Sequence, residues 1–195
     1  MQKKETIIKN SKDTIVNVAL RVFGRLGVYK TTMSDIAQAA KKGRRTIYQY
    51  FKSKDEVYEA VLEKETSNMI TPMQAVVKSE LKPTEKLNKY AQARIAAIYK
   101  IAANHHAFKV GFIQNDKVIL KLRMRFDKFD TELLSQIVDE GIKKGVFKIS
   151  NKELTVKNIL VGLKGMEIDF IKNDFNDNCK KQLDHYINII VNGIL

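Results

Sequence analysis

Residues 31–51 read TTMSDIAQAAKKGRRTIYQYF, and this stretch decides the fold of the N-terminal part of the chain. Its apolar residues recur three and four positions apart, and a polar run around Gly43 interrupts them. We therefore expect two short helices joined by a tight turn. The second helix begins with Arg44 and Arg45 and carries Tyr48 one turn later. A helix that enters a DNA major groove with its N-terminal end needs this arrangement, so the stretch predicts sequence-specific DNA binding.

Positive charge is concentrated around the same stretch. The 195 residues contain 35 Lys and Arg and 22 Asp and Glu, which gives a net charge of +13. Residues 1–56 carry +8 of this excess, and the rest of the chain carries +5. Such an excess suits a polyanionic partner, either nucleic acid or an anionic membrane surface. We therefore expect a basic DNA-binding domain at 1–54 and a less basic body at 55–195.

The whole chain is predicted to be all-α, because its apolar residues recur three and four positions apart. The alternation of apolar and polar residues that is typical of strands is nearly absent. Hydrophobic residues make up 44% of the chain, which argues against wholesale disorder. Capping boxes are expected at Thr32 with Asp35 and at Ser53 with Glu56. Pro72 should kink or end the helix that follows Ser53. The expected helices number about nine, at 11–26, from Thr32, at 44–51, from Ser53, and at 83–104, 108–113, 117–144, 151–173 and 176–195.

The first 60 or so residues resemble the N-terminal domain of the TetR family of bacterial transcriptional regulators. Four features carry the resemblance: the helix end Phe23–Gly27, Thr32, the run IAQAA at 36–40 and the run TIYQYFKSK at 46–54. The resemblance implies a homodimer that binds double-stranded operator DNA. It also implies a variable helical body that binds a small effector, which we expect to be largely apolar, and release from the operator on binding it.

The candidate DNA contacts follow from side-chain chemistry. Arg44 and Arg45 can each make two hydrogen bonds to a guanine edge. Hydroxyl, amide and ammonium groups suit phosphate oxygens, and Thr32 can join backbone amides at a helix N-terminus. The resemblance implies backbone contacts for Tyr48 and Gln49, whereas its Tyr50 position is more often packed in the core. The predicted set is Thr32, Lys41, Lys42, Gly43, Arg44, Arg45, Thr46, Tyr48, Gln49, Tyr50 and Lys54.

The turn between the two short helices departs from the family pattern. The family usually has glycine at the Lys41 position and an apolar residue at the Lys42 position. A left-handed backbone at Lys41 would cost about 1 kcal/mol relative to glycine. The sequence therefore favours a shifted turn that uses Gly43 and leaves both lysines near phosphate.

The body contains polar side chains within its apolar stripes. A binding pocket with a few polar anchors has this pattern, and so does the edge of an ordinary core. The sequence leaves the identity of the effector open. The predicted effector-binding residues are Arg94, Ile98, Tyr99, His105, Gln114, Arg123 and Phe126.

The last two predicted helices are apolar over much of their surface. This pattern predicts that they pack against a second subunit as an intermolecular four-helix bundle. The alternative is a C-terminal helix buried within one subunit. The predicted interface consists of Gly162, Leu163, Met166, Phe170, Tyr186, Ile190 and Ile194.

Motifs for catalysis or metal binding are not found in the sequence. His105 and His106 are adjacent, so on a helix they diverge by about 100° and cannot both face one metal. Cys179 is the only cysteine, so no intrachain disulfide can form. We therefore expect no enzyme, no metal and no cofactor, and a protein of the cytoplasm.

Two functions from other classes are alternatives to a transcriptional repressor. One is a basic peripheral membrane or scaffold protein, which needs a basic amphipathic helix with exposed apolar residues. The helix at 11–26 is instead expected to bury its apolar face in the DNA-binding domain. The other is an enzyme fused to a DNA anchor, for which catalytic groups are missing. A ligand-responsive repressor is the reading that the sequence favours.

Overall fold

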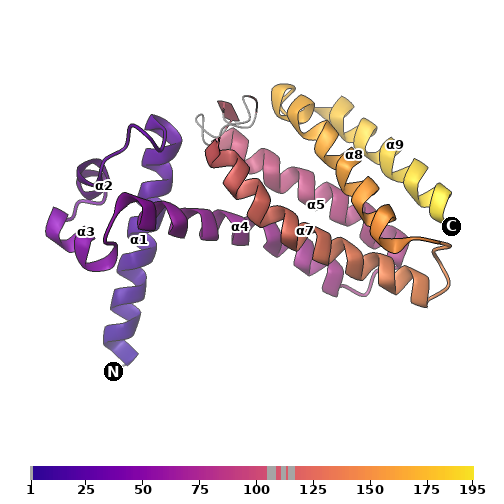
Figure 1. Ribbon diagram of the computed structural model, residues 1–195, viewed down its shortest axis with the longest axis horizontal. Helices are drawn as coiled ribbons and strands as arrows, with labels where there is room; N and C mark the ends of the chain where they lie inside the picture. Colours follow the sequence, from indigo (N-terminus) through magenta and orange to yellow (C-terminus); the bar gives the residue numbers. More distant parts are fainter. Residues whose placement is uncertain (1, 105–108, 111–112, 114–116) are drawn as a thin grey trace.

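The computed structural model describes residues 2–104, 109–110, 113 and 117–195, and this part of the chain is all-helical, as predicted. Figure 1 shows a small N-terminal group of helices and a larger bundle, with α4 running from one into the other. Half of the predicted short helix at 108–113, namely residues 108, 111 and 112, lies outside the described residues. The described helices are α1 (Gln2–Leu26), α2 (Met33–Ala39), α3 (Arg44–Tyr50), α4 (Lys54–Lys78), α5 (Pro83–Asn104), α7 (Lys117–Lys143), α8 (Lys152–Lys172) and α9 (Asp177–Ile194).

Helices α1, α2 and α3 pack around a small apolar core with the start of α4. Ile15 and Phe23 of α1, Ile36 of α2 and Ile47 of α3 are buried, and Val57 of α4 closes the core. The apolar face of α1 within residues 11–26 is thus buried inside the protein, as predicted. No helix in the described ranges has the length and hydropathy to span a bilayer.

The local signals that start α2 and α4 act as the sequence predicted, with one difference. The Thr32 hydroxyl accepts from the Asp35 amide at 3.2 Å, and the Asp35 carboxylate accepts from the Thr32 amide at 2.8 Å. Ser53 likewise caps the Glu56 amide at 3.2 Å. The Glu56 carboxylate, however, accepts from the Lys52 amide, so the second capping box is only half formed.

Helix α4 continues through Pro72, so of the two predicted outcomes, a kink or an end of the helix, the end is excluded. Proline removes one donor and crowds the preceding turn, which costs about 3 kcal/mol in a helix interior. The Pro72 ring lies on the exposed side of α4, whereas Met69, Ile70 and Met73 are buried against the rest of the bundle. This packing holds both halves of α4 in one helix of 25 residues.

Helices α5, α7, α8 and α9 form the bundle together with the second half of α4. Their ends follow the sequence closely: Pro83 opens α5, Asn151 and Asn176 cap α8 and α9, and Gly145, with φ of +67°, follows α7. Figure 1 shows α8 and α9 side by side at the edge of the bundle that lies far from α3. Helix α4 follows α3 in the chain and its second half belongs to the bundle, so α4 connects the N-terminal helices to the bundle.

Candidate functional site

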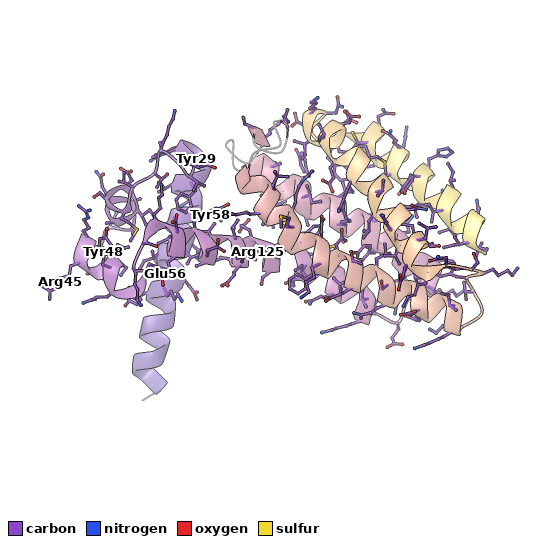
Figure 2. All side chains as sticks on the ribbon, viewed as in Figure 1. Tyr29, Arg45, Tyr48, Glu56, Tyr58 and Arg125 are labelled. Atoms are coloured by element: carbon purple, nitrogen blue, oxygen red, sulfur yellow. The ribbon has the colours of Figure 1, made fainter. Side chains whose placement is uncertain are left out.

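Helix α3 presents a polar, basic face to solvent. Ile47 is fully buried and fixes the helix, while Arg44, Arg45, Tyr48 and Gln49 are exposed. The Arg44 guanidinium carbon lies 5.9 Å from the centre of the Tyr48 ring. Figure 2 shows Arg45 and Tyr48 at the end of the molecule farthest from α8 and α9. This face has the donors that a helix inserted into a major groove would use.

The turn before α3 does not use Gly43 in the predicted way. Lys41 adopts the left-handed conformation, with φ of +51°, while Gly43 is extended, with φ of −60° and ψ of 144°. The Lys42 amide donates to the Ala37 carbonyl at 3.1 Å, and the Lys41 amide donates to Gln38 at 3.1 Å. This pair of bonds is a Schellman motif, which requires a left-handed residue directly after the C-cap. The prediction of a shifted turn was therefore wrong, because these bonds compensate the cost at Lys41.

Two predicted phosphate contacts are engaged within the protein. The Lys54 ammonium donates to the carbonyls of Val28 at 3.0 Å and Tyr29 at 3.3 Å. The Thr32 hydroxyl is paired with Asp35, and this hydrogen bonding holds the pKa of the Asp35 carboxyl below its usual value. Lys54 therefore ties the start of α4 to the loop between α1 and α2.

The remaining predicted DNA contacts differ in exposure. Lys41 and Gly43 are exposed, whereas Lys42 and Thr46 are half-buried. Tyr50 is half-buried and packs against the core, which is the role that the family resemblance implied for it.

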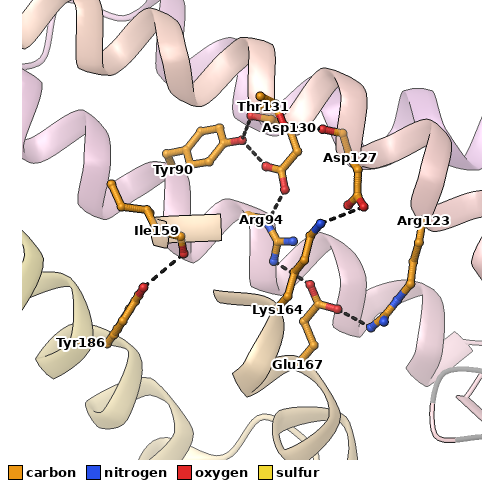
Figure 3. A network of polar contacts seen from close by, with 10 residues as sticks. All are labelled: Tyr90, Arg94, Arg123, Asp127, Asp130, Thr131, Ile159, Lys164, Glu167 and Tyr186. Carbon is orange, nitrogen blue, oxygen red and sulfur yellow. Dashed lines mark hydrogen bonds and ion pairs between the residues drawn. The ribbon is translucent and has the colours of Figure 1, made fainter. Parts of the chain in front are cut away.

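A network of buried charges joins α5, α7 and α8 inside the bundle (Figure 3). Arg94 lies at its centre, with its Nε 2.7 Å from Asp130 and its Nη1 2.8 Å from Glu167. Arg123 also pairs with Glu167, and the Tyr90 hydroxyl donates to Asp130. Burial alone would lower the pKa of the Arg94 guanidinium, but the two carboxylates raise it above its usual value. Burial and the neighbouring Asp130 raise the pKa of Tyr90 well above its usual range.

Four of the predicted effector residues meet beside this network. Arg94, Ile98, Arg123 and Phe126 line an enclosed cavity together with Glu167. Its volume is about 50 Å³, whereas sites for small molecules measure about 300–1,000 Å³. In this conformation the cavity holds water at most.

The other predicted effector residues do not join this cavity. The Tyr99 ring lies 5.8 Å from the ring of Phe175, on the side of α5 that faces the segment between α8 and α9. His105 and Gln114 lie outside the described residues. Asp130 and Glu167 were not predicted from the sequence, although a carboxylate inside an apolar stripe was a usable signal for a buried ion pair.

A much larger depression lies on the surface between α4 and α7. Its volume is about 720 Å³, and its lining includes Ser67, Ile70, Thr71, Met124, Arg125 and Phe129. We call it the α4–α7 groove. Arg125 also forms an ion pair across the two helices with Glu59. None of these residues was predicted to form a site.

The predicted dimer residues divide between core and surface. Leu163 and Phe170 are buried in their own subunit, so their assignment to the interface was wrong. A Cβ on Gly162 would lie 2.0 Å from the Tyr186 hydroxyl, which itself donates to the Ile159 carbonyl at 3.1 Å (Figure 3). Gly162 therefore serves close packing of α8 on α9 within one subunit. Met166, Tyr186, Ile190 and Ile194 are half-buried and remain predictions.

Metal chemistry finds no support in the described ranges, where no three His, Cys, Asp or Glu side chains gather to hold an ion. His185 is exposed on α9, and Cys179 is a buried free thiol near the start of the same helix.

Comparisons with known proteins agree with this arrangement. Residues 15–61 match the family model described as bacterial regulatory proteins, tetR family. The HTH-type transcriptional regulator YhgD of Bacillus subtilis is 25% identical over 148 residues, which cover 74% of this chain and 75% of that protein. The HTH-type transcriptional repressor KstR2 of Mycolicibacterium smegmatis is 27% identical over 143 residues, covering 70% of this chain and 67% of that protein.

A solved structure extends the likeness over nearly the whole chain. The transcriptional regulator FadR from Bacillus subtilis, solved in complex with stearoyl-CoA, superposes with a TM-score of 0.71 at 21% identity. The match covers 93% of this chain and 98% of that one, and it shows a shared fold. The matched residues form a helix-turn-helix with exposed arginines, so residues 15–61 are an N-terminal domain of the tetR family of bacterial regulatory proteins, and the chain as a whole shares the fold of FadR.

Proposed function

We propose that this regulator represses transcription as a homodimer on operator DNA, and that a largely apolar small molecule releases it. The observation that carries the proposal is the exposed row of Arg44, Arg45 and Tyr48 on a helix anchored by buried Ile47. The naming of KstR2 as a repressor supports repression, and the stearoyl-CoA bound to FadR supports an effector. The protein would act in the cytoplasm, where operator DNA is found.

Residues 1–54 would form the reading head, and residues 55–195 would form the effector-binding and dimerisation body. The arginines at the start of α3 would read base edges, because guanidinium groups can bond guanine in pairs. Lys41, Lys42, Tyr48 and Gln49 would contact phosphate and fix the register on the duplex. Lys54 would do so only if it gave up its bonds to the loop before α2.

The dimer would form through the outer faces of α8 and α9. Leu154, Val161 and Ile189 are large apolar side chains that are more than half exposed. A Cβ added at Gly165 would meet no atom within 4 Å, so this part of α8 is open to a close partner. Two helices from each subunit would give a four-helix bundle. Such a rigid link would set the two reading heads at the spacing of DNA half-sites, about 34–36 Å or a multiple of it.

A binding assay on DNA from upstream of the chain's own gene tests the proposal. Arg45→Ala should lower affinity by the value of one bidentate base contact, about 1–3 kcal/mol, or roughly 5- to 150-fold. Lys89→Ala on α5 is the control, because it also removes an exposed positive charge. Equal affinities for wild type and for Arg44→Ala and Arg45→Ala variants would show that α3 does not read the DNA.

A further inference from the structure

We propose that the α4–α7 groove binds an amphipathic anion, a ligand with one aliphatic chain and one anionic head group. The anionic head group would replace Glu59 as the ion-pair partner of Arg125. The ligand would thereby loosen α4, the helix that joins the body to the reading head. This inference rests on the proposed ligand response and assigns it a site and a ligand chemistry.

Size separates the groove from the interior of the bundle. The groove measures about 720 Å³, which lies within the range of small-molecule sites, about 300–1,000 Å³. The cavity beside Arg94 measures about 50 Å³, and its polar groups are already paired with one another. A ligand of more than a few atoms can therefore enter the groove without repacking the core.

The lining of the groove suits an aliphatic chain. Ile70 lines it and is almost fully buried, while Met124 and Phe129 are 72% and 41% exposed on α7. Large apolar side chains grouped at a concave surface are typical of binding sites, because a ligand removes them from water. Methionine also adapts its shape to irregular apolar ligands. Thr71 of α4 borders the same surface.

The head-group preference follows from the cations on α7. Arg125 and Lys128 line the groove together with one carboxylate, Glu63, so two cations and one anion leave the lining with one positive charge. The guanidinium can bind a carboxylate or phosphate through two parallel hydrogen bonds. The Glu59 carboxylate fills that role within the protein. Because both side chains of this pair are about 40% exposed, an anion in solution can reach Arg125 and compete with Glu59 for it. The head group of an anionic ligand would take the place of the Glu59 carboxylate beside Arg125.

The same exchange of ion-pair partners would affect the position of the reading head, because α4 connects the two parts of the protein. Glu59 lies near the start of α4, and Lys54 on that helix holds the loop before α2 through the carbonyls of Val28 and Tyr29. Figure 2 shows Arg125 where α4 enters the bundle, between the bundle and the N-terminal helices. Loss of the Glu59–Arg125 pair removes a contact that holds this part of α4 to the body. The position of the reading head would then be less fixed, and operator affinity would fall.

The experiment measures binding of dodecanoate to the full-length protein by calorimetry, below the concentration at which micelles form. Thr71→Trp should fill the groove and weaken binding at least tenfold. Thr131→Trp on α7 is the matched control, because both threonines are exposed and each donates to the carbonyl four residues earlier at 2.8 Å. Ser67→Trp is a second groove variant, and circular dichroism confirms that each variant is folded.

Two further measurements test the head group and the coupling. Dodecyltrimethylammonium, with the same chain and the opposite charge, should bind at least tenfold more weakly than dodecanoate. Arg125→Gln should reduce dodecanoate binding but leave dodecanol binding unchanged, and dodecanoate should lower operator affinity in the wild type.

The inference is overturned if dodecanoate does not bind, if the cation binds equally well, or if the groove and control variants lose binding alike. A folded groove variant that binds dodecanoate as the wild type does would also overturn it. The proposed function fails separately, when the ligand-free wild type does not bind its operator.

Discussion

Asp130→Asn is the substitution that tests the buried charge network most directly. In the wild type, two carboxylates, Asp130 and Glu167, balance two guanidinium groups, Arg94 and Arg123. The asparagine keeps the shape of the side chain and can still accept from the Tyr90 hydroxyl. It removes one negative charge, however, and leaves two guanidinium groups to share one carboxylate.

The expected loss of stability in Asp130→Asn follows from the burial of these groups. The side chains of Arg94 and Asp130 are 1% and 0% exposed, so solvent cannot take over the role of the lost carboxylate. Breaking a buried ion pair by removing one partner typically costs about 3–5 kcal/mol. A domain has a total stability of about 5–15 kcal/mol, so the variant should lose a large fraction of it.

A double variant separates this charge imbalance from a general packing defect. Arg94→Met alone should also be destabilising, because it leaves Asp130 buried without its cation. Arg94→Met combined with Asp130→Asn restores the balance, since Arg123 and Glu167 still pair with each other. We expect the double variant to be more stable than Asp130→Asn alone, with a coupling energy within the range of about 0.5–3 kcal/mol seen for residues in contact.

Urea denaturation at pH 7, followed by circular dichroism, measures these stabilities. The midpoint should fall in each single variant and recover in part in the double variant, with the slope unchanged. If Asp130→Asn costs less than about 1 kcal/mol, or if the two single effects simply add, the network does not act as a balanced buried unit. Arg94 would then again be a candidate for direct contact with an effector.

The remaining predictions concern the dimer and two titrating carboxyl groups. Val161→Glu places a charge on the exposed face of α8 and should convert the dimer to a monomer, as measured by light scattering. Gln136→Glu, on the exposed side of α7, should leave the dimer intact. A wild type that is monomeric at micromolar concentration would contradict the proposed dimer. Hydrogen bonds from Thr32 lower the pKa of Asp35, so its stabilising effect is present above the usual carboxyl pKa and is lost as the pH falls through the lowered value. Asp35→Asn should therefore reduce stability at pH 7 and match the wild type in acid, and a difference that persists in acid would refute the linkage. Burial raises the pKa of Glu65, so its contribution is complete below the usual carboxyl pKa and is lost as the pH rises through the raised value. Glu65→Gln, which can still accept from Asn68, should therefore gain stability over the wild type at pH 7 but not at pH 4 in urea titrations, and equal differences at the two pH values would count against it.

The sequence alone determined most helix ends and the exposed basic face of α3, because their causes are local. The Thr32 capping box, the Asn151 cap and the glycine that follows α7 act within a few residues of the ends they set. The alternation of buried Ile47 with exposed arginines on α3 is likewise fixed by helical period. These features were predicted correctly from spacing and residue type.

Tertiary structure decided what depends on distant neighbours. Pro72 stays inside α4 because its flanking methionines are buried against the bundle. Leu163 was assigned to the dimer interface because an apolar face does not say whether its partner is the same chain or another copy.

The buried charge network shows most clearly that contacts between distant residues cannot be predicted from local sequence. Asp130 and Arg94 are 36 residues apart in the chain, yet they form a fully buried ion pair. Helical period places each of them on its own helix, but only the packing of α5 on α7 and α8 brings their charges together. Low solvent access then makes each charge depend on its partner, and no local sequence pattern encodes that dependence.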